Sequence, residues 1–516
     1  MPLVAQQSVP PAIDTYVQKT MREWQVPGLA LAVVRNDSLL FAKGYGVREL
    51  GKPEPFDANT VFAIASSTKS FTSAALGMLV DEGKLRWDDH VTTHLPSFQL
   101  SDPSRTADFR VRDLLVHRAG VLRADPLWME TGYSRDEIVR RMRYAPVVAG
   151  FRERMGYTNV MYIIAGQVLA TISGMSWDDF VRTRIFEPLG MRSTSTSIRD
   201  LPRFPNVATP HRLVDGRPQP MEWMDLDNEA AGGAINSTAI DMAQWLRLQL
   251  GGGVYNGRRL LSDTVIRDLR TPHTPSSLRR IYGDLFRGEG HFYTYALGWY
   301  IQDYRGSLMI EHQGALNGAR AEVALFPDED LGVFVFGNLR VGDQPDYINA
   351  LTYRIFDELT GKPRRDWSPD MLAINLDRRN IVYDARGQFQ GYQSKNQNDQ
   401  AHRAQDVGRL PNTRPSLPLD AYPGIYDDSL YGALTVERRG DALSVEWFGP
   451  SEVRGTLKHW HLDTFYVDEW TNPILRNGQR TFFSFIIGVD GRPAELRVEE
   501  HGTFLRRRDA PSRKEH

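Results

Sequence analysis

The chain has 516 residues, which exceeds a typical single domain, so two or three domains are expected. Its formal net charge is −2 and no long block of Lys and Arg occurs, which argues against nucleic acid or an anionic membrane as a main partner. No cysteine is present, so disulfides, thiolate catalysis and cysteine-type zinc sites are excluded.

The first residues bear on location. No apolar run approaches the roughly 18 residues that a membrane span needs, so no span is expected. Residues 1–7 lack the basic and apolar regions of an intact signal peptide, although small residues before Gln6-Gln7 are also what a removed signal leaves. We therefore expect a periplasmic or secreted protein after signal removal, with a cytoplasmic location as the alternative.

Two strands and a helix are expected near the start of the chain. Leu29–Val34 and Leu39–Gly44 are apolar runs separated by a four-residue turn, which predicts a hairpin. Phe71–Val80 has helical spacing and stops before Gly83. Ala321–Phe326 and Gly332–Phe336 predict another strand pair, so strands lie at both ends with helices between. This order favours a mixed α/β domain whose sheet is closed by distant segments.

The composition changes after about residue 365. Residues 366–415 are mostly polar without sustained periodicity, which predicts a linker. Several short alternating segments follow between residues 416 and 508, with turn residues between them. Four of them are Ala433–Glu437, Ala442–Trp447, Thr481–Ile487 and Glu495–Val498. They predict a small antiparallel β-barrel or sandwich.

Three short motifs follow one another along the first domain. Ser66 and Lys69 are three residues apart at the start of the expected helix, so a hydroxyl and an amine share one helix face. An amine in that position activates a serine nucleophile. Tyr157-Thr158-Asn159 and His312-Gln313-Gly314 come later, and each motif alone is a weak signal. The alternative is a simple helix cap at Ser66 with a surface lysine.

Taken together, these motifs resemble the serine β-lactamase and penicillin-binding-protein superfamily, in the branch of class C β-lactamases, DD-peptidases, D-aminopeptidases and esterases. Residues 111–117, 187–191, 231–234 and 241–245 also resemble segments of that family. The resemblance implies an α/β (α+β) domain over residues 12–365, with an antiparallel sheet flanked by helices. Residues 416–508 resemble the lipocalin-like domain that follows some of these hydrolases.

The resemblance also implies roles for individual residues. Ser66 would be the nucleophile, with Lys69 and Tyr157 as the general base system. Free lysine and tyrosine both titrate near pH ~10, so which of them accepts the proton stays open. Asn159 would orient Lys69 and the substrate, and Gly314 would belong to the glycine motif. The backbone N–H groups of Ser66 and Ala315 would form the oxyanion hole.

His312 stands where the family's β-lactamases usually carry lysine. A neutral histidine suits the carboxylate of a penicillin less well, which favours peptides over antibiotics as substrates. Arg320 is a candidate cation for a substrate carboxylate, with a solvated or core-edge arginine as the alternative. The acidic residues Glu222, Asp225, Asp227 and Glu229 could favour an amine-bearing substrate, although a solvated loop is the simpler interpretation.

The sequence therefore predicts a serine hydrolase that forms an acyl-enzyme on Ser66, foremost a peptidase on small peptides with D-residues or from linearised cycles. A carboxylesterase or weak β-lactamase, and a non-hydrolytic penicillin-binding protein, are the alternatives. His459 and His461 share a strand face, but barrel packing explains them better than a metal site. No metal or organic cofactor is implied. The expected partner is a small-molecule or peptide substrate, and a homo-oligomer stays open.

Overall fold

The computed structural model describes residues 7–129, 131–214, 216–276, 283–341, 345–378, 381–383, 389–392, 409–447, 453–471, 480–499 and 501–507. These residues divide into two compact units. The first is built from the described residues of Met1–Asp125 and Arg135–Arg379, and the second from those of Pro126–Ser134 and Asn380–His516.

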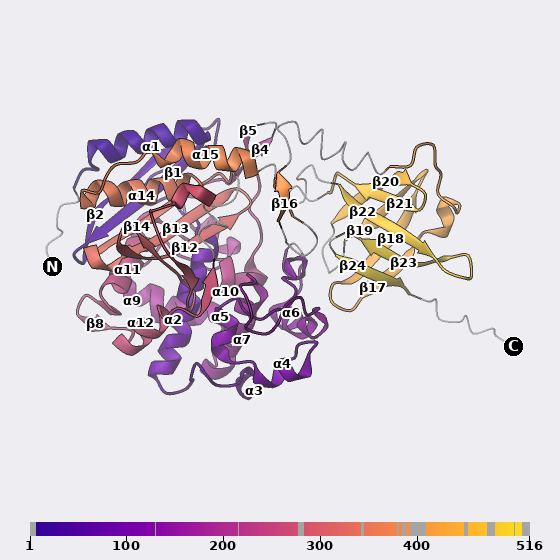
Figure 1. Ribbon diagram of the computed structural model, residues 1–516, viewed down its shortest axis with the longest axis horizontal. Coiled ribbons are helices and arrows are strands. Elements are labelled where there is room, and N and C mark those ends of the chain that lie inside the picture. Colours follow the sequence, from indigo (N-terminus) through magenta and orange to yellow (C-terminus); the bar gives the residue numbers. More distant parts are fainter. Residues whose placement is uncertain are drawn as a thin grey trace. The chain divides into compact units, whose positions relative to one another are not determined.

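An antiparallel sheet forms the centre of the first unit (Figure 1). In the described residues it has eight strands in the order β2-β1-β14-β13-β12-β11-β10-β9. Their bounds are β1 Gly28–Arg35, β2 Ser38–Gly46, β9 Thr274–Ser276, β10 Tyr293–Tyr295, β11 Tyr300–Tyr304, β12 Ser307–Leu316, β13 Ala319–Phe326 and β14 Leu331–Gly337. Both expected strand pairs are present, and Leu31 pairs with Val335, so the two ends of the domain close the sheet as the sequence predicts.

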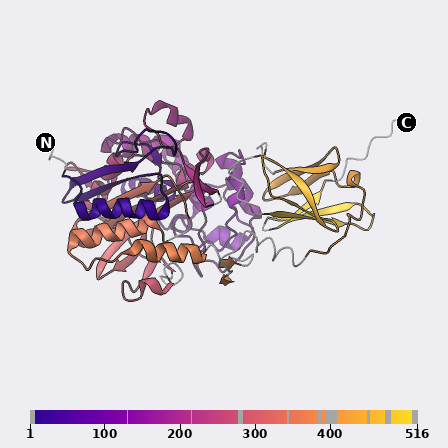
Figure 2. The same cartoon turned by 90° about the horizontal axis from the view of Figure 1, so that it is seen from above.

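Helices cover both faces of this sheet. α1 (Pro11–Trp24), α14 (Tyr347–Thr360) and α15 (Trp367–Arg378) lie side by side on one face (Figure 2). α11 (Ala239–Leu250) packs on the other face, where Gly332 leaves room for Leu246 and Leu250. Side chains of β1 and β14 are buried on both faces, which explains why their sequences are continuous apolar runs rather than alternating ones.

The first unit extends past the expected boundary at residue 365. Trp367 opens α15, is fully buried, and has its ring 5.4 Å from that of Phe286 and 5.5 Å from that of Tyr353. This aromatic cluster fixes α15 to the domain, so residues 367–378 are not linker. Most of the rest of the expected linker lies outside the described residues, which here include the paired strands β15 (Ile381–Tyr383) and β16 (Phe389–Tyr392).

The helix α2 (Thr68–Asp81) contains the expected helix Phe71–Val80. α7 (Val160–Ser173) and α10 (Ala230–Gly233) pack against it. The others are α3 Val91–His94, α4 Pro103–Asp108, α5 Val111–Leu115, α6 Arg135–Arg141, α8 Trp177–Val181, α9 Glu187–Leu189 and α12 Asp263–Leu269. Three small two-stranded pairs are β3 Phe62–Ala63 with β6 Asn236–Ser237, β4 His211–Val214 with β5 Arg217–Pro220, and β7 Val254–Tyr255 with β8 Arg258–Arg259.

No single helix in the described residues is long and apolar enough to cross a membrane. The pair Val160–Ser173 and Trp177–Leu189 reaches the required composition only when joined, and its two parts are bent by 75°.

The second unit is a closed antiparallel β-barrel, as the sequence predicts. Its strands are β17 Gly424–Asp428, β18 Gly432–Arg439, β19 Ala442–Glu446, β20 Arg454–His461, β21 Thr464–Val467, β22 Thr481–Ile487, β23 Pro493–Val498 and β24 Gly502–Arg506. The segment Pro126–Ser134 belongs to this unit although it is inserted in the hydrolase sequence. There the Tyr133 hydroxyl donates a hydrogen bond of 2.9 Å to the Tyr431 carbonyl.

Candidate active site

Ser66 and Lys69 are in direct contact. Ser66 lies in the 3₁₀ turn Ala65–Ser67, which runs directly into α2, and Lys69 follows one turn later. The Lys69 Nζ donates to Ser66 Oγ at 3.0 Å and to the Gly232 carbonyl at 2.7 Å. The lysine is fully buried whereas Ser66 stays partly exposed, so the amine is held in place beside a hydroxyl that a substrate can reach.

The strand β12 is fastened to the turn that carries Ser66. The Ser67 hydroxyl donates to the His312 carbonyl at 3.0 Å. Gly314 lies so close to the turn that an added Cβ would be 2.1 Å from the Ile64 carbonyl oxygen. Ala65 in that turn has φ +48°, a left-handed conformation uncommon for a residue with a side chain. The glycine motif is therefore required because backbone packs directly on backbone here.

Tyr157 lies close to Lys69. Its ring centroid is 5.1 Å from the Lys69 Nζ and 5.5 Å from the Arg123 guanidinium, so two cations flank the ring. The His117 ring packs against it with centroids 3.9 Å apart. The Thr158 N–H donates to His117 Nδ1 at 3.2 Å, which fixes the loop that carries the tyrosine. His117 lies in one of the family-like segments, but its contact with Tyr157 was not predicted.

Asn159 caps the start of α7 close to the same loop. Its Nδ2 donates to Asp125 Oδ1 at 3.4 Å, and only 6% of the residue is exposed. Its Oδ1 is buried and has no hydrogen-bond partner among the described residues. No local pattern in the sequence indicates Asp125 as the partner.

His312 is buried and neutral. Its Nδ1 lies 2.8 Å from the Gln313 carbonyl, which can only accept, so Nδ1 carries the proton. Nε2 then accepts from the Tyr295 hydroxyl at 2.9 Å. Burial, together with the nearby Lys69 charge, lowers the pKa of His312 to about 3. The position therefore holds no cation at neutral pH.

Arg320 is buried next to the glycine motif of β12. It is 1% exposed, and its Nε is paired with Asp346 at the start of α14. Its other two nitrogens donate to the Gly314 carbonyl at 2.9 Å and to Gln313 Oε1 at 3.0 Å. A contact with a substrate carboxylate would have to replace one of these bonds, so in this structure Arg320 holds β12 rather than facing a ligand.

The acidic residues of the Glu222–Glu229 stretch do not form one group. Glu222 is exposed, and Asp225 and Asp227 pair with Arg199 at 3.5 and 2.7 Å. Only Glu229 is buried, with 2% exposed. The stretch is therefore mostly solvated, as the simpler interpretation holds, with one exception at its end.

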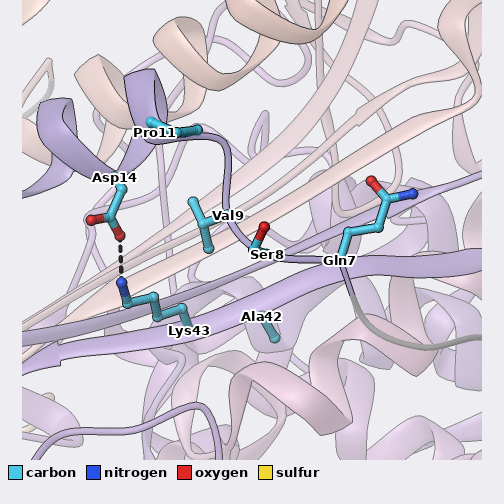
Figure 3. Close-up of a pocket in the computed structure, with 7 residues that line it drawn as sticks. All are labelled: Gln7, Ser8, Val9, Pro11, Asp14, Ala42 and Lys43. Atoms are coloured by element: carbon cyan, nitrogen blue, oxygen red, sulfur yellow. Dashed lines mark hydrogen bonds and ion pairs between the residues drawn. The ribbon is translucent and has the colours of Figure 1, made fainter.

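A pocket near β2 and the two barrel histidines are further features outside this group of residues. A pocket of about 380 Å³ is lined by Gln7, Ser8, Val9, Pro11, Asp14, Ala42 and Lys43 (Figure 3). It lies between the start of α1 and the edge strand β2, and none of the expected site residues lines it. In the barrel, the His461 ring accepts the Leu410 N–H at 3.2 Å, and His459 Nε2 lies 2.9 Å from the Leu462 carbonyl. Within the described residues, no three metal-binding side chains come together.

The site combines a buried lysine that contacts a serine, a neighbouring tyrosine, and a strand with a glycine packed against the serine turn. Together with an antiparallel sheet flanked by helices, this arrangement defines a serine hydrolase of the β-lactamase type. The profile of the beta-lactamase family matches residues 13–355, and the chain belongs to this family. The profile of a domain of unknown function, DUF3471, matches residues 409–509, which contain the barrel.

The chain is similar to several characterised hydrolases and penicillin-binding proteins. It is 28% identical to unguisins hydrolase ungD of Aspergillus violaceofuscus over 448 residues, which are 81% of this chain and 75% of the relative. It is 28% identical to penicillin-binding protein 4 of Amycolatopsis lactamdurans over 349 residues, 66% of this chain and 87% of the relative.

Solved structures agree in fold. The octameric penicillin-binding protein homologue from Pyrococcus abyssi has a TM-score of 0.60 at 20% identity, covering 96% of this chain and 99% of that one. The D-amino acid amidase from Ochrobactrum anthropi SV3 has a TM-score of 0.55 at 23% identity, covering 68% and 99%. These likenesses confirm the expected β-lactamase-like fold, and the family membership makes the protein a serine hydrolase.

Proposed function

We propose that this serine hydrolase is a peptidase that cleaves small peptides, including those with D-residues or from linearised cycles, through an acyl-enzyme on Ser66. The observation that carries the proposal is the 3.0 Å contact between the buried Lys69 amine and Ser66 Oγ. Similarity to a hydrolase named for the unguisins supports an unusual peptide as the substrate class.

The proposed reaction follows from the contacts. Ser66 Oγ attacks the substrate carbonyl carbon and passes its proton to the Lys69–Tyr157 pair. The tetrahedral intermediate collapses, the C–N bond breaks, and the leaving amine takes up that proton. Water then attacks the ester on Ser66, and the same pair accepts the water proton. The bond between the acyl carbon and Ser66 Oγ breaks, the pair returns the proton to Ser66 Oγ, and the carboxylic acid product leaves.

The oxyanion of the intermediate would be held by the backbone N–H groups of Ser66 and Ala315. Arg320 holds the Gly314 carbonyl at 2.9 Å, and in a trans peptide the following N–H points the opposite way. The guanidinium therefore orients the peptide whose N–H donates to the oxyanion. Losing one donor of this kind typically costs ~3–4 kcal/mol in the transition state.

The neutral His312 supports a peptide rather than a penicillin as substrate. The carboxylate of a β-lactam antibiotic is best held by a permanent cation. Here the side chain at that position is uncharged at neutral pH, and Arg320 is committed to Asp346 and to the β12 backbone.

Three chromogenic substrate classes test the proposal: p-nitroanilides of short D- and L-peptides, p-nitrophenyl esters, and nitrocefin. We expect sustained p-nitroanilide hydrolysis, with nitrocefin the poorest substrate. An enzyme that is fast only on short esters would contradict the peptidase proposal in favour of an esterase. Acylation of Ser66 without sustained turnover of any substrate would instead indicate an acyl-binding protein.

A further inference from the structure

Glu229 is a buried carboxylic acid fitted against the glycine pair Gly232-Gly233. It immediately precedes α10 and is 2% exposed. A Cβ added at Gly232 would lie 1.7 Å from Glu229 Oε1, and one added at Gly233 would lie 2.5 Å from Oε2. The two glycines therefore leave the space that the carboxyl group occupies.

This carboxyl group lies close to the nucleophile through a short chain of contacts. The Gly232 carbonyl, beside Glu229, accepts the Lys69 Nζ at 2.7 Å, and the same Nζ is 3.0 Å from Ser66 Oγ. The acyl half of a substrate becomes bonded to Ser66, so it stays next to Lys69 and the glycine pair. The acyl group on Ser66 is therefore the part of a substrate that we expect nearest to Glu229.

One oxygen of this carboxyl group, Glu229 Oε1, has no hydrogen-bond partner in the part of the chain that the structure describes. The nearby cations are engaged elsewhere: Arg135 with Asp178, Arg123 with Asp125, and Lys69 with Ser66 and Gly232. Burial raises the pKa of Glu229 to about 8. A buried polar atom without a partner destabilises a fold, so a donor from a bound substrate would stabilise Oε1, which has none among the described residues.

We propose that Glu229 binds a protonated amine carried by the acyl part of the substrate. This subsite rests on the proposed function, which it narrows to substrates with an amino group near the scissile carbonyl. An ammonium provides the N–H donors that Oε1 lacks, and a carboxylate–ammonium contact away from water is a strong hydrogen bond. Asp225 and Asp227 do not compete for the amine because both pair with Arg199.

Four substrates and two variants test the subsite. Glycyl and β-alanyl p-nitroanilides place an ammonium one or two carbons from the carbonyl, and their N-acetylated forms remove the charge. We expect the wild type to prefer the free amines. Glu229→Gln should lower kcat/KM for them by about 10- to 100-fold while changing the N-acetylated substrates by about threefold or less. The matched control is Glu222→Gln, the same change at an exposed position, which should behave as wild type.

An equal change of both substrate types in Glu229→Gln would overturn the subsite. A second readout does not depend on peptidase activity: glycinamide or β-alaninamide should protect Ser66 from a fluorophosphonate probe in the wild type but not in Glu229→Gln. That result would support the subsite even if no p-nitroanilide were hydrolysed, in which case the proposed function alone would fail. An absence of protection in the wild type would overturn the subsite.

Discussion

The lysine beside Ser66 is enclosed by aromatic rings as well as by hydrogen bonds. Its Nζ lies 5.1 Å from the centroid of Tyr157 and 5.2 Å from that of Tyr162. The faces of aromatic rings attract a buried ammonium. No carboxylate is needed for this, and a carboxylate would compete with Ser66 for the amine. At this scale the proposed chemistry depends on single atoms, above all the Tyr157 hydroxyl.

Tyr157→Phe removes that hydroxyl and keeps the ring that packs 3.9 Å from His117. Because the hydroxyl is proposed to share the proton from Ser66, we expect kcat on p-nitrophenyl esters to fall by about 10²- to 10⁴-fold. KM and the midpoint of thermal unfolding should change little. A kcat within about threefold of wild type would show that Lys69 works without the phenol.

The buried His312 predicts how stability depends on pH. Its pKa is about 3 in the folded chain and roughly 6.5 when unfolded, so protonation favours unfolding. The stability that follows from keeping it neutral is fully present above pH ~6.5 and is lost as the pH falls toward 3, by up to about 1.4 kcal/mol per pH unit.

His312→Gln, which cannot titrate, isolates this contribution. The unfolding midpoint of the wild type should fall more between pH 7 and pH 5 than that of the variant, as measured by calorimetry at several pH values. Parallel curves for the two proteins would contradict this account, because they would mean that His312 takes up a proton as readily in the folded chain as in the unfolded one.

At the scale of elements, the site depends on how closely β12 approaches the turn Ala65–Ser67. Gly314→Ala would place a methyl group 2.1 Å from the Ile64 carbonyl oxygen and 3.0 Å from the Ala65 Cβ. The strand must then move away from Ser66, which separates the two proposed oxyanion donors. We expect kcat/KM to fall by about 10²-fold or more.

Gly156→Ala is the matched control, because a Cβ there meets nothing within 4 Å and its φ is not in the left-handed region. Its activity should stay near that of the wild type. If Gly314→Ala were equally active, the close strand–turn contact would have no part in catalysis.

The sequence predicts elements where the pattern is local. The apolar runs of β1 and β14 predict buried strands, and the structure contains them. The spacing of Ser66 and Lys69 predicts their contact within one helical turn. The predicted domain end at residue 365 comes too early, because the burial of Trp367 depends on rings distant in sequence.

Partners far apart in the chain were also not predictable. Arg320 and Asp346 form an ion pair because β13 packs on α14. The sequence offers Arg320 as a cation for the substrate, whereas in the structure its guanidinium pairs with a residue of the domain core. Residue spacing does not indicate that Glu229 Oε1 lacks a partner among the described residues. It also does not indicate that Pro126–Ser134 belongs to the barrel unit. Tertiary packing decides each of these.

At the scale of the whole molecule, the two units are connected by more than the polar segment after α15. The chain leaves the first unit after Asp125, a partner of Asn159, contributes Pro126–Ser134 to the barrel unit, and returns at Arg135. Asp125, which contacts the candidate site residue Asn159, is therefore next in sequence to a segment of the barrel unit.

Trp128→Ala tests whether this segment is part of the barrel's core. Trp128 is 5% exposed, and truncating a buried tryptophan costs about 3–5 kcal/mol. We expect calorimetry to show a lower midpoint of thermal unfolding for the barrel unit, while Ser66 can still be labelled. Leu410→Ala, at a 50% exposed position, should have little effect. An unchanged barrel transition in Trp128→Ala would contradict this role of the segment.

The central claim is that Ser66 carries the acyl group during turnover. The most direct measurement is mass spectrometry of the intact protein quenched during hydrolysis of a p-nitrophenyl ester, followed by peptide mapping. The account predicts a mass increase equal to one acyl group, located on Ser66, and neither adduct nor turnover in Ser66→Ala. An adduct on another residue, or turnover that survives in Ser66→Ala, would contradict it.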